Sequence, residues 1–575
     1  MGIFRKVHHC ATLDSRLRCN PLKASIIIPP FGSIFMVSML YCLTMLHELA
    51  FRLAPRAMPS RLSVRPPDFH RRMLGWSHST IHSQRRSPVR NWASSATEPT
   101  IDRLLACTWL TTTPEQLTPD DVLSNCPLTA SNLSSNYTPI LLFTPAFAQW
   151  ADTRSAFFQR WMNQFFKKTS NNVSPVHTVV AIIDRLPYNH ARGSSDAPTE
   201  SEGVSILLTR SEDILGKAVA PRQPRSVGAR EPTLLFSFQD GVKNIGGTHG
   251  LIHEIGLRLA NTVFLNGKEN TLVGARWSPD PSTAGLRLDE SIDLSACSVA
   301  INTVNIANSL DIPLHPVGER RKVISSMGNI LRQISKHTDG RLDEPMPASA
   351  ELEKELPRYI AEHGIADQRV TVWALTETSA ESPYNKSTHS RSSLAKAIEM
   401  GAKLHRVMSG GGGWGKKQGL LSLDPEMSFG QDDNGSLQPL HRLMLPNAAD
   451  SVDEAEIPLE EPVSIQDLST LSQVVEPGDF VQFLVSVEEQ QPHTNRGFIS
   501  SEETVLCDFG VLSNADTLLS QTTQQKDITI VSQYFGALSE KAVTYLQPST
   551  QPHSRVSETI TKIDVPGSRV LLKVV

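Results

Sequence analysis

The sequence has little cysteine and no paired cysteine motif. Its 575 residues include seven Cys, at positions 10, 19, 42, 107, 126, 297 and 507, and none of them forms a C-x-x-C pair. Four lie beyond residue 97, too few for a disulfide scaffold and wrongly spaced for structural zinc. The pattern indicates a reducing compartment and buried structural cysteines.

Positive charge is scarce outside the N-terminal region. Residues 1–97 contain 14 Lys and Arg but only three acids, a charge of about +11, so the rest of the chain carries about -15 within a net charge of -4. An acidic body does not favour the phosphate backbone of nucleic acid. We therefore expect no nucleic-acid partner.

The basic region 1–97 has the composition of a targeting sequence. Residues 58–96 are rich in Arg and Ser and contain one acid, which is typical of a mitochondrial presequence. We expect a mitochondrial protein, in the matrix or at the inner membrane. The alternatives are a basic tail without targeting function, and a membrane-anchored or cytoplasmic location.

Residues 24–47 within this region carry no Lys, Arg, Asp or Glu. The stretch is long enough for one membrane span, although Pro29, Pro30 and Gly32 interrupt its first half. Three interpretations stay open: an anchor, a signal-type segment, and an upstream extension that is absent from a mature protein starting near Met58. Membrane contact is expected only if residues 24–47 are retained.

Strand-like and helix-like segments alternate along the body, which predicts an α/β fold with buried strands. Expected strands are 138–145, 177–186, 202–210, 232–241 and 270–277, and expected helices are 151–168 and a segment near 251–260. The aromatic residues of 151–168 have helical spacing, which favours core packing over a ligand site.

The C-terminal half allows an α/β or an α+β arrangement. A helix is expected within 345–360, an amphipathic helical stretch over 393–408, and strands at 370–375 and 478–489. Residues 429–470 are acidic and interrupted by Pro, which predicts a flexible insertion. Further strands are expected in a β-rich extension, 501–575.

The order of these segments resembles the paired N- and C-terminal FIST regions of bacterial sensory proteins and some F-box proteins. Four passages carry the resemblance: ILLFTPAF through EGVSILLTR, LLFSFQDG with TLVGARW, PLHPVGERRKVISSMGNILRQI with its following helix, and GWGKKQGLLSLDPE with VEPGDFVQFLV. It implies two packed β/α units, 98–305 and 306–500. The acidic insertion splits the last two elements, and no F-box-like helical segment precedes Leu104.

The resemblance also implies a function, which is sensing or binding a small, amino-acid-like ligand without catalysis or cofactor. A protein-interaction scaffold is the alternative. An uncharacterised hydrolase or transferase ranks third, because no nucleophile or acid–base set converges in the sequence and no G-x-S-x-G elbow is present.

The glycine-rich stretch 409–426 partly matches the sequence pattern of a nucleotide-binding loop. Gly410–Lys416 fits G-x-x-x-x-G-K, but Lys417 stands where the magnesium-binding Ser or Thr belongs. The expected flanks are also reversed, with a helix before the glycines and a strand after them. We interpret the run as a linker into the C-terminal sheet.

The candidate ligand site lies in 232–277. Gly241, Gly246, Gly247 and Thr248 follow a predicted strand and precede the predicted helix, so their N–H groups are candidates for holding a carboxylate or phosphate. A tight turn without a ligand is the alternative. Arg276 and Trp277 are expected at a strand end, lining a cleft in which Arg276 pairs with a carboxylate.

A metal site is not expected. His249 and His253 are four residues apart, which would place them on one helix face, but Gly250 stands where a metalloprotease has Glu, and no third ligand is evident.

Overall fold

The structure of the chain is a computed structural model, and the residues that it describes lie between positions 104 and 575. The described residues are 104–125, 136–166, 175–188, 200–219, 231–240, 252–282, 285–337, 344–365, 370–378, 391–410, 419–426, 429, 437–445, 474–486, 504–513, 528–547 and 559–575. The basic region 1–97, including segment 24–47, lies outside them. Within the described part, no helix is long and apolar enough to cross a membrane.

The largest element of the fold is a mixed sheet. Its strands follow the order β22 (Thr529–Ser532), β1 (Leu105–Thr111), β5 (Glu200–Arg210), β2 (Tyr137–Phe143), β3 (Val176–Ile182), β9 (Leu272–Pro279), β10 (Leu286–Thr303), β7 (Thr233–Asp240), β8 (Ile252–Arg258), β24 (Val543–Gln547) and β25 (Thr559–Ile563). The short strands β4 (Leu186–Pro187), β6 (Ile214–Ala218) and β19 (Gln438–Pro439) pair at its margins. All seven residues of β3 are buried, as expected of a strand covered on both faces.

Helices cover one face of the large sheet. The unit β2–α3–β3 is a crossover, because β2 and β3 pair in parallel around α3 (Ala156–Phe165). Ser155 caps α3 by accepting a hydrogen bond from the Phe158 N–H. The predicted core role of the aromatic side chains is confirmed: Phe157, Phe158, Trp161, Phe165 and Phe166 are all buried. The short elements α2 (Pro119–Ser124), η1 (Pro114–Gln116), η3 (Pro145–Phe147), η4 (Ser211–Asp213) and α4 (Val263–Asn266) lie in connections.

A smaller sheet packs through apolar side chains on the opposite face. Its strand order is β11 (Ile306–Asp311), β26 (Arg569–Val574), β21 (Val505–Val511) and β23 (Tyr534–Ser539). Phe509 and Phe535 from this sheet contact Phe236 of β7, with ring centroids 5.2 and 5.4 Å away. The large sheet therefore lies between the helices on one face and the smaller sheet on the other.

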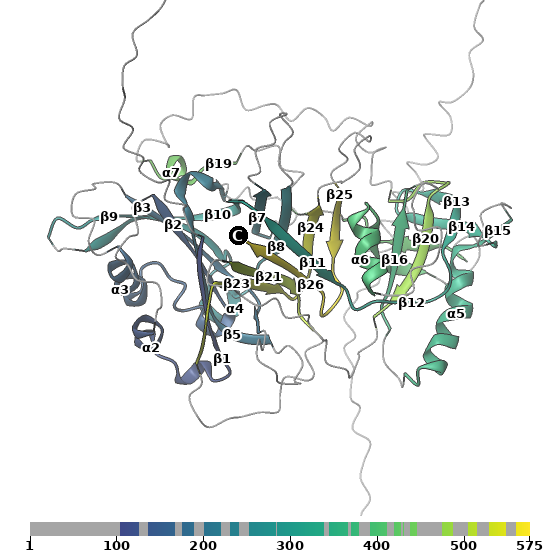
Figure 1. The fold of residues 1–575 in the computed structure, drawn as a ribbon, viewed down its shortest axis with the longest axis horizontal. Helices are drawn as coiled ribbons and strands as arrows, with labels where there is room; N and C mark the ends of the chain where they lie inside the picture. Colours follow the sequence, from purple (N-terminus) through teal and green to yellow (C-terminus); the bar gives the residue numbers. More distant parts are fainter. Residues whose placement is uncertain are drawn as a thin grey trace, which may run out of the picture. The chain divides into compact units, whose positions relative to one another are not determined.

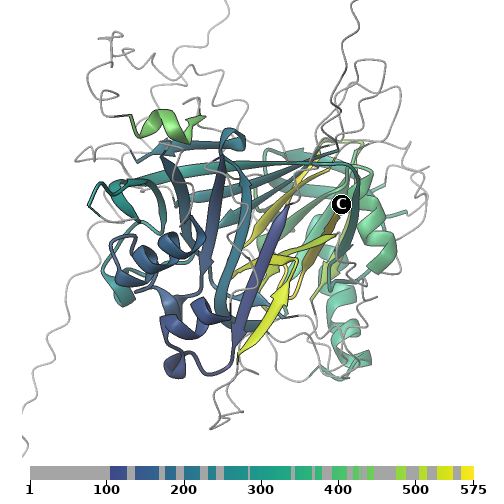
Figure 2. The ribbon, with the colours of Figure 1, turned by 60° about the vertical axis from the view of Figure 1, so that its left-hand side comes forward.

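The C-terminal strands lie among the N-terminal ones. Figure 1 and Figure 2 show the yellow C-terminal strands beside the blue strands of the large sheet. β22 pairs with β1, β24 pairs with β8, and β26 pairs with β11. The described strands of residues 501–575, β21 to β26, thus complete the sheets begun by residues 105–311.

The intervening region forms a closed barrel. Its antiparallel strands follow the order β20 (Phe480–Val485), β13 (Arg321–Met327), β14 (Ile330–Ser335), β18 (Leu421–Leu423), β17 (Lys403–Gly410) and β16 (Val372–Glu377), and β16 pairs with β20 to close the ring. β12 (His315–Pro316) and β15 (Pro345–Pro347) add short pairings, while α5 (Ala348–Glu362) and α6 (Arg391–Glu399) pack beside it. The predicted mixed α/β class is confirmed, with strands predominating.

Three local predictions are wrong. Residues 252–258 form the strand β8 and not a helix, because β7 and β24 pair with both of its edges. The helix expected over 393–408 ends at Glu399, and β17 follows it. The insertion 429–470 is not irregular throughout, since Gln438–Leu443 form β19 and α7 (Leu440–Leu443). In each case tertiary pairing decides a segment whose local pattern is ambiguous.

Candidate functional site

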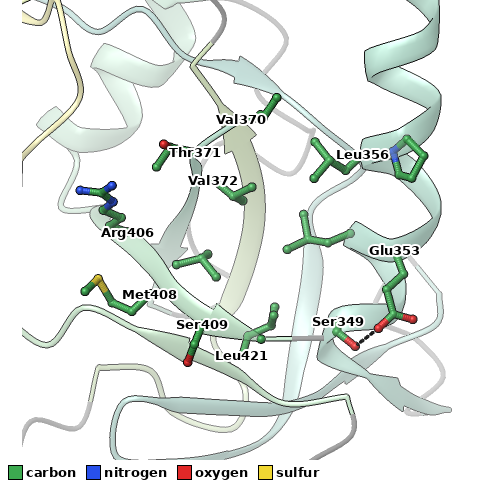
Figure 3. Close-up of a pocket in the computed structure, with 14 residues that line it drawn as sticks. Ser349, Glu353, Leu356, Val370, Thr371, Val372, Arg406, Met408, Ser409 and Leu421 are labelled. Carbon is green, nitrogen blue, oxygen red and sulfur yellow. Dashed lines mark hydrogen bonds between the residues drawn. The ribbon is translucent and has the colours of Figure 1, made fainter. Parts of the chain in front are cut away.

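The described residues form a pocket between helix α5 and the strands of the barrel. Its volume is about 630 Å³. The lining comes from the helix, from the chain entering β16, from β17 and from β18: Ser349, Leu352, Glu353, Leu356, Pro357, Val370, Thr371, Val372, Arg406, Val407, Met408, Ser409, Gly410 and Leu421. Figure 3 shows Leu356 and Glu353 on the helix side, opposite Val372 and Leu421 on the strand side. The pocket is thus walled by regular elements.

Apolar packing and the buried Glu351 hold helix α5 against the barrel. Ala348 and Leu352 pack into the barrel core, and Ala, Glu, Leu and Lys are good helix formers. Glu351 is 3% exposed and accepts a hydrogen bond from Arg321 Nε of β13 at 2.7 Å. Its other oxygen accepts the Glu319 N–H at 3.2 Å. These charge-assisted bonds attach the first turns of α5 to the barrel.

The floor of the pocket is apolar and its margins are polar. Val372, Val407 and Leu421 contact or belong to the apolar core of the barrel. Ser349 Oγ donates a hydrogen bond to Glu353 Oε1 at 2.7 Å, which leaves the second carboxylate oxygen to accept from a ligand. Arg406 lies at the opposite margin, with its guanidinium directed away from the apolar side chains (Figure 3). Such a lining suits a small molecule with an apolar body and a polar end.

A buried histidine lies on the same strand as part of the lining. His405 is two residues from Val407, and its Nδ1 donates a hydrogen bond to the Asp424 carbonyl at 2.9 Å. Burial lowers the pKa of His405 to about 4, an effect that this hydrogen bond partly opposes. His405 is therefore neutral at physiological pH.

Of the residues predicted for the ligand site, the two that the structure describes, Arg276 and Trp277, do not line this pocket. Gly241, Gly246, Gly247 and Thr248 lie outside the described residues. The helix that Thr248 was expected to cap is β8. His253 therefore lies on a strand, where its Nδ1 is 3.2 Å from the Tyr545 hydroxyl. Within the described residues, no group of His, Cys, Asp and Glu could hold a metal ion.

Arg276 and Trp277 lie within β9 and not at its end. Trp277 is fully buried, and its indole N–H donates to Thr178 Oγ1 at 3.3 Å. Arg276 donates through Nη1 to the Met444 carbonyl, and the Asp289 carboxylate lies 3.7 Å from its Nε. The cleft expected at a strand end is thus occupied by the chain itself, and a ligand-binding role of Arg276 stays a prediction.

The glycine run connects two antiparallel strands. β17 ends at Gly410 and pairs with β18, whose first residue is Leu421. A phosphate loop needs a helix after its glycines, whereas the next described element is a strand, as predicted. Gly410 and Leu421 also line the pocket. No local pattern signals this placement, because the lining residues come together only when the barrel closes.

Three of the four cysteines beyond residue 97 are described. Cys107, Cys297 and Cys507 are free and buried, and burial raises the pKa of Cys297 to about 12. Burial also raises the pKa of Cys507, so the thiols of Cys297 and Cys507 are un-ionised at neutral pH. The predicted burial of these cysteines is confirmed. Cys126 lies outside the described residues.

No protein-family model matches the chain, and it has no significant match among curated proteins or solved structures. The FIST resemblance therefore stays a prediction.

Proposed function

We propose that this protein binds a small amine-containing ligand with an apolar body in the pocket between α5 and the barrel. The observation that carries the proposal is the Ser349–Glu353 pair beside an apolar floor. An ammonium group would donate to Glu353 while the apolar body covers Leu352, Val372 and Leu421. The FIST resemblance, which implies an amino-acid-like ligand, is consistent with this chemistry.

The proposal extends to the polarity of the ligand. Glu353 is the sole acid and Arg406 the sole base among the described lining residues, and they lie at opposite margins (Figure 3). The amino and carboxylate groups of one α-amino acid are close together. Such a molecule would pair its amine with Glu353, but its carboxylate would not reach Arg406. A ligand whose amine matters more than its carboxylate is therefore expected. Such a protein would act as a binding or sensing component, located in mitochondria if region 1–97 is a targeting sequence.

Leucinamide, L-leucine and 4-methylpentanoate test the proposal, because they share a side chain and differ in charge. Thermal unfolding should shift upward with leucinamide and leucine and stay unchanged with 4-methylpentanoate. Glu353→Gln should weaken leucinamide binding at least tenfold in calorimetry, since it removes the charge opposite the ammonium. Glu362→Gln, on the same helix but outside the lining, is the matched control. Equal binding of all three probes, or no binding by the wild type, would refute the proposal.

A scaffold function is the second candidate, favoured by one exposed feature. Phe264 and Leu265 of α4 are 96% and 58% exposed, which is unusual for apolar side chains that point to water from a hydrogen-bonded turn. In this case the three probes would leave the melting temperature unchanged, and a defined partner would copurify with the wild type but not with a Phe264→Asp/Leu265→Asp variant.

A further inference from the structure

A second pocket lies at the large sheet. It has a volume of about 630 Å³ and shares no lining residue with the pocket beside α5. Its walls are β9 and β10, the segment 151–154 before α3, the end of β6 and residues 268–270 before β9. Asp293 of β10 pairs with Val273 of β9, and Ser291 lies two positions before Asp293, so these three residues share one face of the sheet. The volume is typical of a site for a small molecule.

Contacts between the lining residues fix the walls of this pocket. Thr153 is 4% exposed, and its Oγ1 lies 3.1 Å from Ser291 Oγ, which attaches the segment 151–154 to β10. Asp152 Oδ1 accepts a hydrogen bond from the Arg154 N–H at 3.2 Å and lies 3.3 Å from Lys268 Nζ. The pocket is therefore formed by elements that are bonded to one another before any ligand enters.

Two charged side chains of the lining are open. Asp152 and Lys268 pair with each other. In contrast, the guanidinium of Arg154 and the carboxylate of Asp293 form no ion pair or hydrogen bond within the described part of the chain, and both side chains are exposed. The contact between Thr153 and Ser291 joins the segment that carries Arg154 to the strand that carries Asp293. The pocket thus offers a cation, an anion and two hydroxyl groups.

We propose that this pocket binds a free dipeptide. The ammonium group of the dipeptide donates to the carboxylate of Asp293, and its carboxylate accepts from the guanidinium of Arg154. Its peptide group lies between them, where it donates to and accepts from the hydroxyls of Thr153 and Ser291. An apolar side chain of the dipeptide covers Val273. This site has a different ligand from the amine site beside α5 and does not depend on it.

The pattern of charges favours a dipeptide over simpler ligands. A ligand with one charge would leave the second charge of the pocket partly desolvated and without a partner. A single α-amino acid has both charges on one carbon atom. A dipeptide spans about 7 Å when extended, and two positions along a strand, from Ser291 to Asp293, also span about 7 Å. A chain of methylene groups between the charges would leave the two hydroxyls facing apolar atoms.

Four probes test the proposal by calorimetry: L-alanyl-L-alanine, its N-acetyl form, its C-terminal amide and 5-aminopentanoate. The full chain carries Glu353→Gln, so that the pocket beside α5 does not bind the amine. Alanylalanine should bind at least tenfold more tightly than either blocked form, because each lacks one charge. It should also bind at least fivefold more tightly than 5-aminopentanoate, which has a similar charge spacing but no peptide group. No binding of alanylalanine, or equal binding of its blocked forms, would overturn the proposal.

Two substitutions assign the charges to the ends of the ligand. With Asp293→Asn the free and N-acetylated dipeptides should bind equally, and with Arg154→Gln the free and amidated dipeptides should bind equally. Both residues are exposed, so the substitutions should leave the fold intact. Glu290→Gln and Arg287→Gln, on β10 but outside the lining, are the matched controls and should keep both preferences. Retention of both preferences in the Asp293 and Arg154 variants would show that the dipeptide binds elsewhere, and the proposal would be wrong.

Discussion

The large sheet and the barrel are assembled in different ways. The sheet joins distant parts of the chain: Ala106 N–H donates to the Gln533 side chain across 427 positions, and β24 lies beside β8. The barrel is built mainly from sequence neighbours such as β13–β14 and β17–β18, with β20 closing it. Each region has a pocket of about 630 Å³, one between α5 and the barrel and one at the large sheet, lined in part by Val273, Ser291 and Asp293. The large sheet depends on contacts between distant parts of the chain, whereas the more local barrel carries the candidate site.

The substitution with the largest expected loss of stability shows whether the large sheet and the barrel unfold separately. Trp277→Ala would remove a fully buried side chain that stacks on Phe158 at 6.4 Å between centroids. The free energy of unfolding should fall by about 3–5 kcal/mol in urea denaturation. Hydrogen exchange should increase in β3 and β9 and stay unchanged in β16 and β20. Equal loss of protection in the barrel would show that both regions form one cooperative unit.

Acid should weaken both regions through one histidine each. Burial lowers the pKa of His177 to about 4, and the nearby His441 and Arg276 act in the same direction. His405 in the barrel has a pKa of about 4 as well. Between pH 6.5 and 4 the unfolded chain binds a proton at each site that the folded chain does not, so stability is retained above pH 6.5 and lost as the pH falls. Each histidine should contribute a loss of up to about 3 kcal/mol at pH 4.

Glutamine substitutions separate these two contributions. His177→Gln should remove the acid-dependent increase in hydrogen exchange of the large sheet and of residues 437–445. His405→Gln should remove the corresponding increase in the barrel. His337→Gln, at an exposed position, is the control and should change neither. A stability profile in urea that is the same for all three variants and the wild type would contradict the assignment.

The smallest expected effect concerns the ionic contacts between the regions. Glu426, which follows β18 of the barrel, pairs with Arg258 of β8 and with Lys562 of β25, the latter at 2.6 Å. Because Glu426 is partly exposed, Glu426→Gln should cost no more than about 1 kcal/mol, and less at high salt. Glu344→Gln, which affects an exposed pair within the barrel region, is the control. A larger, salt-independent loss would mean that this contact holds the regions together.

Local pattern was sufficient for much of the fold. The apolar runs of β2 and β3 and the aromatic spacing of α3 predicted a strand–helix–strand unit, because each pattern has a single period. The segment 251–260 has no single period, and the helix predicted there was wrong. Ile255 and Leu257 alternate as in a strand, while His249 and His253 have helical spacing, and the pairing of β8 with β7 and β24 decided between them.

The candidate pocket was less predictable than the elements that form it. The helix containing Leu352 and the strand containing Val372 were both expected, but their proximity depends on the pairing of β16 with β20, which no local signal encodes. Arg276 and Trp277 were expected together at a strand end, lining one cleft, yet they are neighbours within β9 and point to opposite faces of the sheet. Arg276 lies under residues 437–445, and Trp277 lies in the aromatic core with Phe158.

Composition and short-range spacing were enough to predict the strongly periodic segments, the burial of the described cysteines and the mixed α/β class. Three features could be read only from the folded chain: the C-terminal strands enter the N-terminal sheets, six strands close into a barrel, and residues 437–445 pack over Gly216 and Gly274. These features rest on contacts between residues far apart in the chain. Their free energy comes from burial and pairing in the folded state, which local sequence does not specify.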